Sequence, residues 1–235
     1  MRRLFILLLL PVVVSCDQIM GEEGNGEIIT ETRAVDEFDA LEISGMFDVI
    51  LEPGNKPLVT ITGDENLMQW ISVKTSSGTL VIDSEKRLRS ESGIKIVINY
   101  QALEEINSSG ASNIIAEETL FGDRLRLIIS GAGKTDLSLA VKSIDIEMSG
   151  AALIYLSGVA EVLRASLSGA GSMEAYSLET VNCELQISGV GSANVNVTGD
   201  LEAQVSGVGG VEYIGNPKNV HRDVSGVGSI NEGKE

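Results

Sequence analysis

The sequence predicts an all-β protein: a parallel β-helix, or β-solenoid, built from coils of about 19 residues with Ser-Gly corners. Three observations support this prediction. A Ser-Gly pair recurs at nearly constant spacing in the second half of the chain, and apolar residues alternate with polar ones on both sides of each pair. The Asn-Gly and Asp-Gly dipeptides that close tight hairpins are missing between the expected strands. An antiparallel β-sandwich or prism with glycine-rich turns is the alternative.

The N-terminal segment, residues 1–16, has the features of a bacterial export signal. Two arginines precede an apolar run, residues 4–14, which is shorter than a membrane-spanning helix requires. The run ends in Val13-Val14-Ser15-Cys16, which resembles the lipobox of bacterial lipoproteins. The resemblance implies that residues 1–15 are a lipoprotein signal peptide that is removed, and that the thiol of Cys16 is lipidated at the new N-terminus.

The next segment, residues 16–27, is acidic, contains glycine and shows no sustained periodicity. We expect it to form a flexible acidic tether between the lipid and the folded domain. The N-terminal lipid would attach the protein to a membrane. Together with the export signal it predicts an outer-membrane lipoprotein of the cell envelope, facing either the periplasm or the cell surface.

Residues 28–105 predict an irregular β portion that caps the N-terminal end of the solenoid. The stretch 41–51 (LEISGMFDVIL) contains the repeated unit around Gly45. Less regular strands follow it, and residues 64–70 fit one helical turn. We expect Met68 and Trp70, both in this turn, to plug the open end of the hydrophobic core.

Residues 106–235 predict the regular part of the solenoid. The sequence intervals between successive glycines of the Ser-Gly pairs are 21, 19, 19, 20, 18 and 19. A corner between two strands requires either a positive φ or a backbone without a side chain, and glycine provides both. The predicted structural corners, including the earlier unit, are Gly45, Gly110, Gly131, Gly150, Gly169, Gly189, Gly207 and Gly226.

Alignment on these glycines shows that the even offsets are apolar and the odd offsets mostly polar, which is the period of strands with one buried face. The residues six positions before the glycines are Leu125, Ile144, Leu163, Cys183, Leu201 and Val220. Cys183 is therefore expected to be a buried, unreactive thiol. A unit of this size has no core of its own and buries its inward residues only by stacking on its neighbours.

Three stretches together resemble the family described as putative auto-transporter adhesin, head GIN domain, which contains Bacteroidota-type envelope proteins. They are Arg33-Ala34-Val35 with Phe38 and the segment 41–54, the run of SGAG and SGVG repeats, and the segment 215–220 leading to SGVGSI at 225–230. The resemblance covers nearly the whole mature chain. It implies a β-helical domain on a lipid anchor and an adhesin-like role, and it brings no catalytic residues.

The composition excludes several classes of protein. A formal net charge of −17 argues against nucleic acid as a partner, because its phosphates require lysine and arginine. A single histidine, His221, rules out a site that needs two, and two cysteines leave no room for a cysteine-rich zinc site. We therefore expect no catalytic residues, no metal and no cofactor.

Stacked coils place equivalent residues in outward columns about 4.8 Å apart. Five positions before the glycines the column is Arg126, Asp145, Arg164, Glu184, Glu202 and His221, which predicts a structural ladder of charges. Five positions after them it is Asp136, Tyr155, Glu174, Asn194, Glu212 and Asn231, which predicts a solvated polar surface able at most to hold a hard cation weakly. The serines before the glycines are expected to hydrogen-bond the backbone of neighbouring coils.

These features predict a non-enzymatic, lipid-anchored envelope module that binds a glycan, a matrix component or another envelope protein on its flat polar faces. A structural scaffold lipoprotein is one alternative. A carbohydrate-active β-helix enzyme is another, and a cleft with convergent arginine and acidic side chains would favour it.

Overall fold

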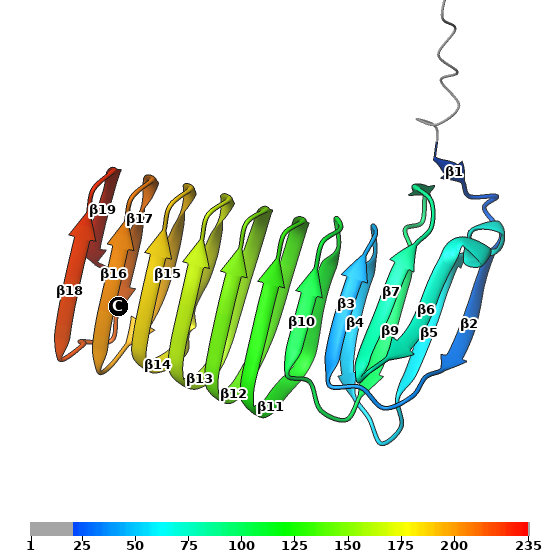
Figure 1. Ribbon diagram of the computed structural model, residues 1–235, viewed down its shortest axis with the longest axis horizontal. Helices are drawn as coiled ribbons and strands as arrows, with labels where there is room; N and C mark the ends of the chain where they lie inside the picture. Colours follow the sequence, from blue (N-terminus) through cyan, green and yellow to red (C-terminus); the bar gives the residue numbers. More distant parts are fainter. Residues whose placement is uncertain (1–20, 235) are drawn as a thin grey trace, which may run out of the picture.

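The computed structural model describes residues 21–234, which form a flattened tube of stacked β-coils (Figure 1). The signal peptide expected at residues 1–15 and the lipidation site Cys16 lie outside the described residues. Within residues 21–234, the only helix is the 3-10 helix η2 (Glu65–Trp70), at the position where one helical turn was predicted. No helix in this range is long and apolar enough to cross a membrane.

The regular coils consist of parallel strands. The four longest strands each run round a whole coil, from one corner to the next: β11 (Asn113–Ile129), β12 (Ala132–Met148), β13 (Ala151–Leu167) and β14 (Ala170–Ile187). The last coils are formed by β15 (Val190–Val197), β16 (Asp200–Val205), β17 (Val208–Ile214), β18 (Asn219–Val224) and β19 (Val227–Glu232). Every pairing between these strands is parallel, so the solenoid prediction is confirmed and the sandwich or prism alternative is wrong.

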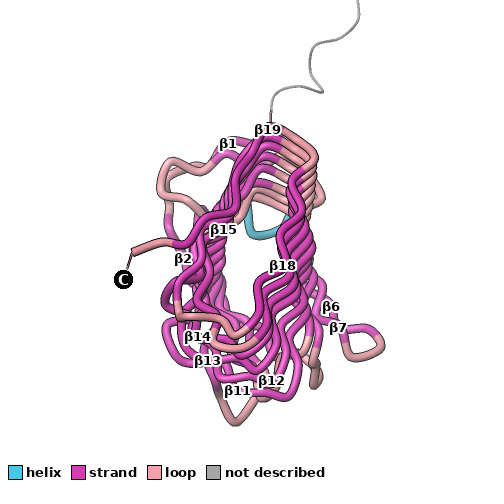
Figure 2. Tube along the Cα trace, turned by 90° about the vertical axis from the view of Figure 1, so that its left-hand side faces the viewer, coloured by secondary structure: helices cyan, strands magenta, loops and turns pink. Residues whose placement is uncertain are grey.

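Each coil has two faces and two edges (Figure 2). The first face contains the strand segments that precede the corner glycines, and the second face contains those that follow them. The corner edge carries the glycines, and at the far edge strands β11 to β14 bend without a break. Inward side chains of both faces fill the space between them. Five members of one predicted column are each at most 4% exposed: Leu125, Ile144, Leu163, Cys183 and Leu201. The last member, Val220, is only partly buried.

The N-terminal portion contains coils as well as a cap. β3 (Ala40–Ser44) and β4 (Asp48–Pro53) meet at Gly45 and pair in parallel with β10 (Glu105–Ser108) and β11. On their other side they pair in parallel with β7 (Thr79–Ser84) and β9 (Lys95–Tyr100). The coil of β7 and β9 comes later in the sequence than that of β3 and β4, but it lies on the N-terminal side of it in the tube. The chain then continues with β10 on the other side of β3. The repeat pattern does not reveal this order.

Antiparallel strands close the N-terminal end of the tube. β5 (Leu58–Asp64) pairs with β9, β2 (Ile28–Ala34) pairs with β5, and β6 (Ile71–Ser76) pairs with β7. Next to them, Met68 in η2 is buried, and Trp70 is partly buried against the core. Both side chains therefore help to cover the open end of the core, as expected.

Residues 22–27, expected in a flexible tether, are hydrogen-bonded to this cap. β1 (Glu22–Glu23) pairs with β8 (Leu88–Arg89), and the Gly24 amide donates to the Arg89 carbonyl at 2.8 Å. The Gly26 amide donates to Asp64 Oδ1 at 2.7 Å. The sequence did not predict this contact, because a strand of two residues is too short to show a periodic pattern. Its partner is also a loop that is distant in the sequence.

Candidate binding site

The predicted corner glycines lie at bends between strands in a continuous column. Three of the serines before them donate to the backbone of the neighbouring coil: Ser109 Oγ to the Ile43 carbonyl at 3.5 Å, Ser168 Oγ to the Met148 carbonyl at 3.3 Å, and Ser206 Oγ to the Ile187 carbonyl at 3.4 Å. The predicted hydroxyl bonds between coils are therefore present at these three corners.

The first face carries the charge ladder. Arg126, Asp145, Arg164, Glu184, Glu202 and His221 are consecutive partners in the parallel register. Arg164 lies 3.4 Å from Asp145 and 3.9 Å from Glu184. A hollow of about 180 Å³ lies beside these three residues. Since the one guanidinium there is shared by two carboxylates, the geometry is that of a structural ion-pair ladder.

Arg126 departs from the simple column. Its guanidinium pairs with Glu147 at 2.8 Å and Glu105 at 3.7 Å, and Arg124 takes the contact with Asp145 at 3.0 Å. The ladder is therefore a network across three neighbouring outward columns, those of Arg124, Arg126 and Glu147. At its C-terminal end, His221 is exposed and in register with Glu202, as the sequence predicts.

The second face has a larger hollow, of about 500 Å³, which we call the tyrosine hollow. It is formed where β12, β13 and β14 lie side by side. Its lining residues are Asp136, Tyr155, Leu156, Ser157, Glu174, Tyr176 and Ser177. Three of them belong to the predicted acid and amide column, but the repeat pattern did not single out Tyr176.

Strand alternation places Tyr176 in this hollow, because it stands seven positions after Gly169, an odd offset that faces outward. A β-bulge follows at the same place. Tyr155 pairs with Glu174, and Ser157 pairs with Ser177, so β14 has one more residue than β13 between these pairs. The extra residue is visible in the sequence, because the interval from Gly169 to Gly189 is one residue longer than each of the two intervals before it.

Hydrogen bonds hold the polar groups of the tyrosine hollow in place. Tyr176 Oη donates to Glu212 Oε1 at 2.6 Å, and Asn194 Nδ2 donates to Glu174 Oε2 at 2.7 Å. Partial burial of the Tyr176 hydroxyl, its hydrogen bond to Glu212 and the negative charges of Glu212 and Glu174 all raise its pKa above the ordinary value. The hydroxyl therefore stays protonated and acts as a donor.

Lys134 contacts two of the residues that line the tyrosine hollow. Its ammonium group lies 2.8 Å from Asp136 Oδ2 and 4.7 Å from the centroid of the Tyr155 ring. This pairing raises the pKa of Lys134, first through the hydrogen bond to Asp136. Aromatic faces, carboxylates and an ammonium group thus lie together on a rigid sheet.

The fold does not bring together the ligands that a cation site in the acid and amide column would need. Within residues 21–234, no group of three or more His, Cys, Asp or Glu side chains is placed to hold a metal ion. Glu174 and Glu212 bind Asn194 and Tyr176, and Asp136 binds Lys134. The arrangement suits an uncharged polar ligand with hydroxyl groups better than a bare cation.

The fold and the surface define a β-solenoid whose polar faces are available for binding. Residues 37–217 match the family described as "Putative auto-transporter adhesin, head GIN domain", and the chain belongs to this family. The family description supports an adhesin-like function at the cell envelope or surface.

Solved structures share the fold. A putative adhesin from Bacteroides fragilis is 27% identical, with a TM-score of 0.85 over 90% of this chain and 100% of that one. A putative lipid binding protein from Parabacteroides distasonis (22% identity, TM-score 0.72, 91% and 99% covered) and a putative adhesin from Parabacteroides merdae (24% identity, TM-score 0.63, 91% and 99% covered) share the fold alone. No curated protein matches the chain.

Proposed function

We propose that the protein is a lipid-anchored adhesin of the cell envelope, which binds a glycan in the tyrosine hollow. The single observation that carries the proposal is the grouping of Tyr155 and Tyr176 with the carboxylates of Asp136 and Glu174 around a hollow of about 500 Å³. The aromatic content of the chain is only 4%, so two tyrosines at one place on this surface are unusual.

The chemistry of the hollow fits a sugar. The faces of aromatic rings pack against the apolar C–H faces of pyranose rings, and carboxylates accept hydrogen bonds from sugar hydroxyls. Glu174 and Glu212 are each held through one oxygen by a neighbouring side chain, which leaves the other oxygen for a ligand. The parallel sheet fixes the positions of these groups before the ligand arrives, which reduces the entropic cost of binding.

A lipid on Cys16 would attach this binding face to a membrane, as the sequence Val13-Val14-Ser15-Cys16 predicts. We place the protein at the outer membrane, with a glycan or an envelope protein as its partner. In cells, Cys16→Ala is expected to move the protein from the membrane fraction to the soluble fraction. A wild-type protein that fractionates as soluble would contradict the anchor.

The glycan is tested on an array of bacterial and host polysaccharides. For the glycans that bind wild type, Tyr155→Ala and Glu174→Gln should each weaken affinity by about tenfold or more, the size of a lost central contact. Glu202→Gln, the same chemical change on the first face, is the matched control and should bind as wild type does. Absence of binding to every glycan would overturn the proposal and favour a structural scaffold.

A further inference from the structure

An exposed apolar ridge runs along the corner edge. The residue that follows each corner glycine is exposed in every coil, and parallel pairing stacks these residues in one column. We call this column the corner ridge; it consists of Met46, Ala111, Ala132, Ala151, Ala170, Val190, Val208 and Val227. The four larger side chains are 56%, 61%, 51% and 76% exposed, in the order Met46, Val190, Val208 and Val227.

Apart from its first corner, residues 44–48, which contains Asp48, the ridge lacks the acidic residues that are common elsewhere on this chain. The corner segments 109–113, 130–134, 149–153, 168–172, 188–192, 206–210 and 225–229 contain no Asp or Glu, and Lys134 is their only charged residue. The far edge also exposes apolar side chains, Phe121, Val159 and Val181, but these lie among acidic residues: Glu117, Glu118, Asp123, Glu161 and Glu179. An anionic surface would therefore repel the far edge far more than the corner edge.

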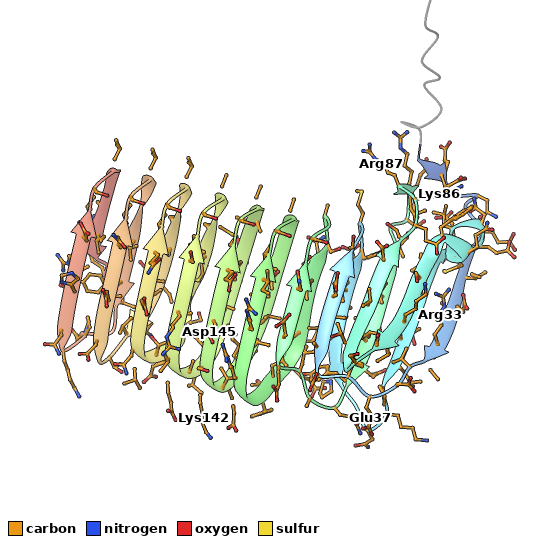
Figure 3. All side chains as sticks on the ribbon, in the orientation of Figure 1. Arg33, Glu37, Lys86, Arg87, Lys142 and Asp145 are labelled. Atoms are coloured by element: carbon orange, nitrogen blue, oxygen red, sulfur yellow. The ribbon has the colours of Figure 1, made fainter. Side chains whose placement is uncertain are left out.

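The N-terminal segment meets the fold at the same edge as the ridge. β1 pairs with β8, and the loop that contains β8 lies against Gly45, Met46 and Ala111 at the start of the ridge. Figure 1 shows β1 on the side of the corners, Figure 3 shows Lys86 and Arg87 there, and Lys142 lies at the opposite edge.

The distance between the fold and the lipidation site is short. Five residue steps separate Cys16 from Gly21. An extended chain spans at most about 3.6 Å per residue, so Gly21 lies within about 18 Å of a lipidated Cys16. The start of the ridge is therefore held close to the membrane surface in which the lipid is embedded.

We propose that the corner ridge rests on the lipid surface that holds the N-terminal acyl chains, so that the solenoid lies along the membrane. This inference rests on the proposed lipid anchor. Apolar side chains gain free energy at the boundary between headgroups and acyl chains. The corner amides need no water, because they bond to the neighbouring coil; the Ala132 and Ala151 amides each donate to a glycine carbonyl at 2.9 Å.

Arginines at the end of the ridge suit lipid headgroups. Arg87 and Arg89 are exposed in the loop beside Met46, and guanidinium groups bind phosphate well. The same loop contains Glu85 and Glu91, so apolar contact rather than net positive charge carries the interaction. In this orientation both polar faces, including the tyrosine hollow, stand beside the lipid surface and remain open to ligands.

The test uses the full lipidated protein in vesicles of phosphatidylethanolamine and phosphatidylglycerol. An environment-sensitive fluorophore is attached to Val208→Cys on the ridge or to Val159→Cys on the far edge, positions with 51% and 53% exposure. Cys183 is buried and does not take the label. We expect the ridge probe to shift its emission to the blue and to be quenched several-fold more strongly by spin-labelled lipids than the far-edge probe.

Equal, weak quenching of both probes on vesicle-bound protein would overturn the ridge proposal while leaving the anchor intact. A blue shift at Val208→Cys without lipid quenching, with crosslinks between copies through the same cysteine, would overturn it in favour of ridge-to-ridge association of two molecules. Protein that does not float with the vesicles would instead overturn the anchor itself. The failure of the proposed lipid anchor is thus read from flotation, before the probes are compared.

Discussion

The carbonyl oxygen of Gly150 lies where a side chain on Gly169 would have to be. The same relationship links each regular corner to the one before it. Gly169 itself has no positive φ, and neither do the other corner glycines from Gly110 to Gly226. At the seven corners from Gly110 to Gly226, the structure therefore supports close approach of backbones and not a left-handed conformation as the reason for glycine. Gly45, the first predicted corner, differs, with a φ of 156° and the Phe47 ring where a side chain would lie.

We predict that Gly169→Ala destabilises the protein by about 1–3 kcal/mol, because its Cβ would overlap the carbonyl of a neighbouring coil. Gly122→Ala is the matched control, since a Cβ there would meet nothing closer than the Arg124 carbonyl oxygen at 3.8 Å. Its effect should stay within about 0.5 kcal/mol. Chemical denaturation of both variants measures the difference, and equal losses would contradict the close-approach explanation.

Adjacent residues in β13 provide a second test of the fold. Leu163 is fully buried and Arg164 is an exposed member of the charge ladder. We expect Leu163→Ala to cost about 2–5 kcal/mol through lost burial and a cavity. Arg164→Ala should cost less than about 1 kcal/mol, because its ion pairs are screened by solvent. Thermal melting compares the two variants, and a larger loss for Arg164→Ala would contradict the assigned register.

The sequence was sufficient to predict the register of the regular coils. Its even offsets identified the buried column of Leu163 and Cys183, and its odd offsets identified the ladder from Arg126 to His221. Both patterns repeat in every coil, so a local shift at one coil does not erase them. Because equivalent residues of successive coils stack on one another, the repeated pattern directly predicts which residues are in contact.

Features that occur once were not predictable in this way. The coil of β7 and β9 pairs with the coil of β3 and β4 on its N-terminal side. This pairing joins segments that are distant in the sequence, and no repeat indicates it. The hydrogen bonds of residues 22–27 to the cap depend on a loop that is distant in the sequence, at Arg87 and Arg89. The β-bulge beside Tyr176 follows from one extra residue, which changes the spacing by only one.

The Cys183 thiol should be inert in the folded protein. Burial, and secondarily the charge of Glu184, raise the pKa of this thiol. In a Cys16→Ser background, we expect no reaction with a disulfide reagent at mildly alkaline pH until denaturant is added. A Val208→Cys variant in the same background is the control, because its surface thiol should react at once. Rapid labelling of Cys183 in the native protein would show that the core column is open to solvent.

The last prediction concerns the hydrogen-bonded pair of Tyr176 and Glu212. The raised pKa of the Tyr176 hydroxyl means that the folded state favours its protonated form more than the unfolded state does. The resulting stabilisation is therefore fully present below the ordinary tyrosine pKa of about 10 and is lost as the pH rises through the folded-state value. In an absorbance titration, the phenolate signal removed by Tyr176→Phe should belong to the most alkaline part of the tyrosine curve.

Glu212→Gln distinguishes the effect of the Glu212 hydrogen bond on the pKa of Tyr176 from the effect of burial. It removes the charged acceptor and one of the nearby negative charges, so the pKa of Tyr176 should move back toward the ordinary tyrosine value while remaining above it, because partial burial persists. Glu202→Gln, the same chemical change on the first face, is the control. If Tyr176 titrated with an ordinary pKa in wild type, the hydroxyl would not be held by Glu212. The tyrosine hollow would then lack the fixed donor and acceptor on which its proposed recognition of sugar hydroxyls depends.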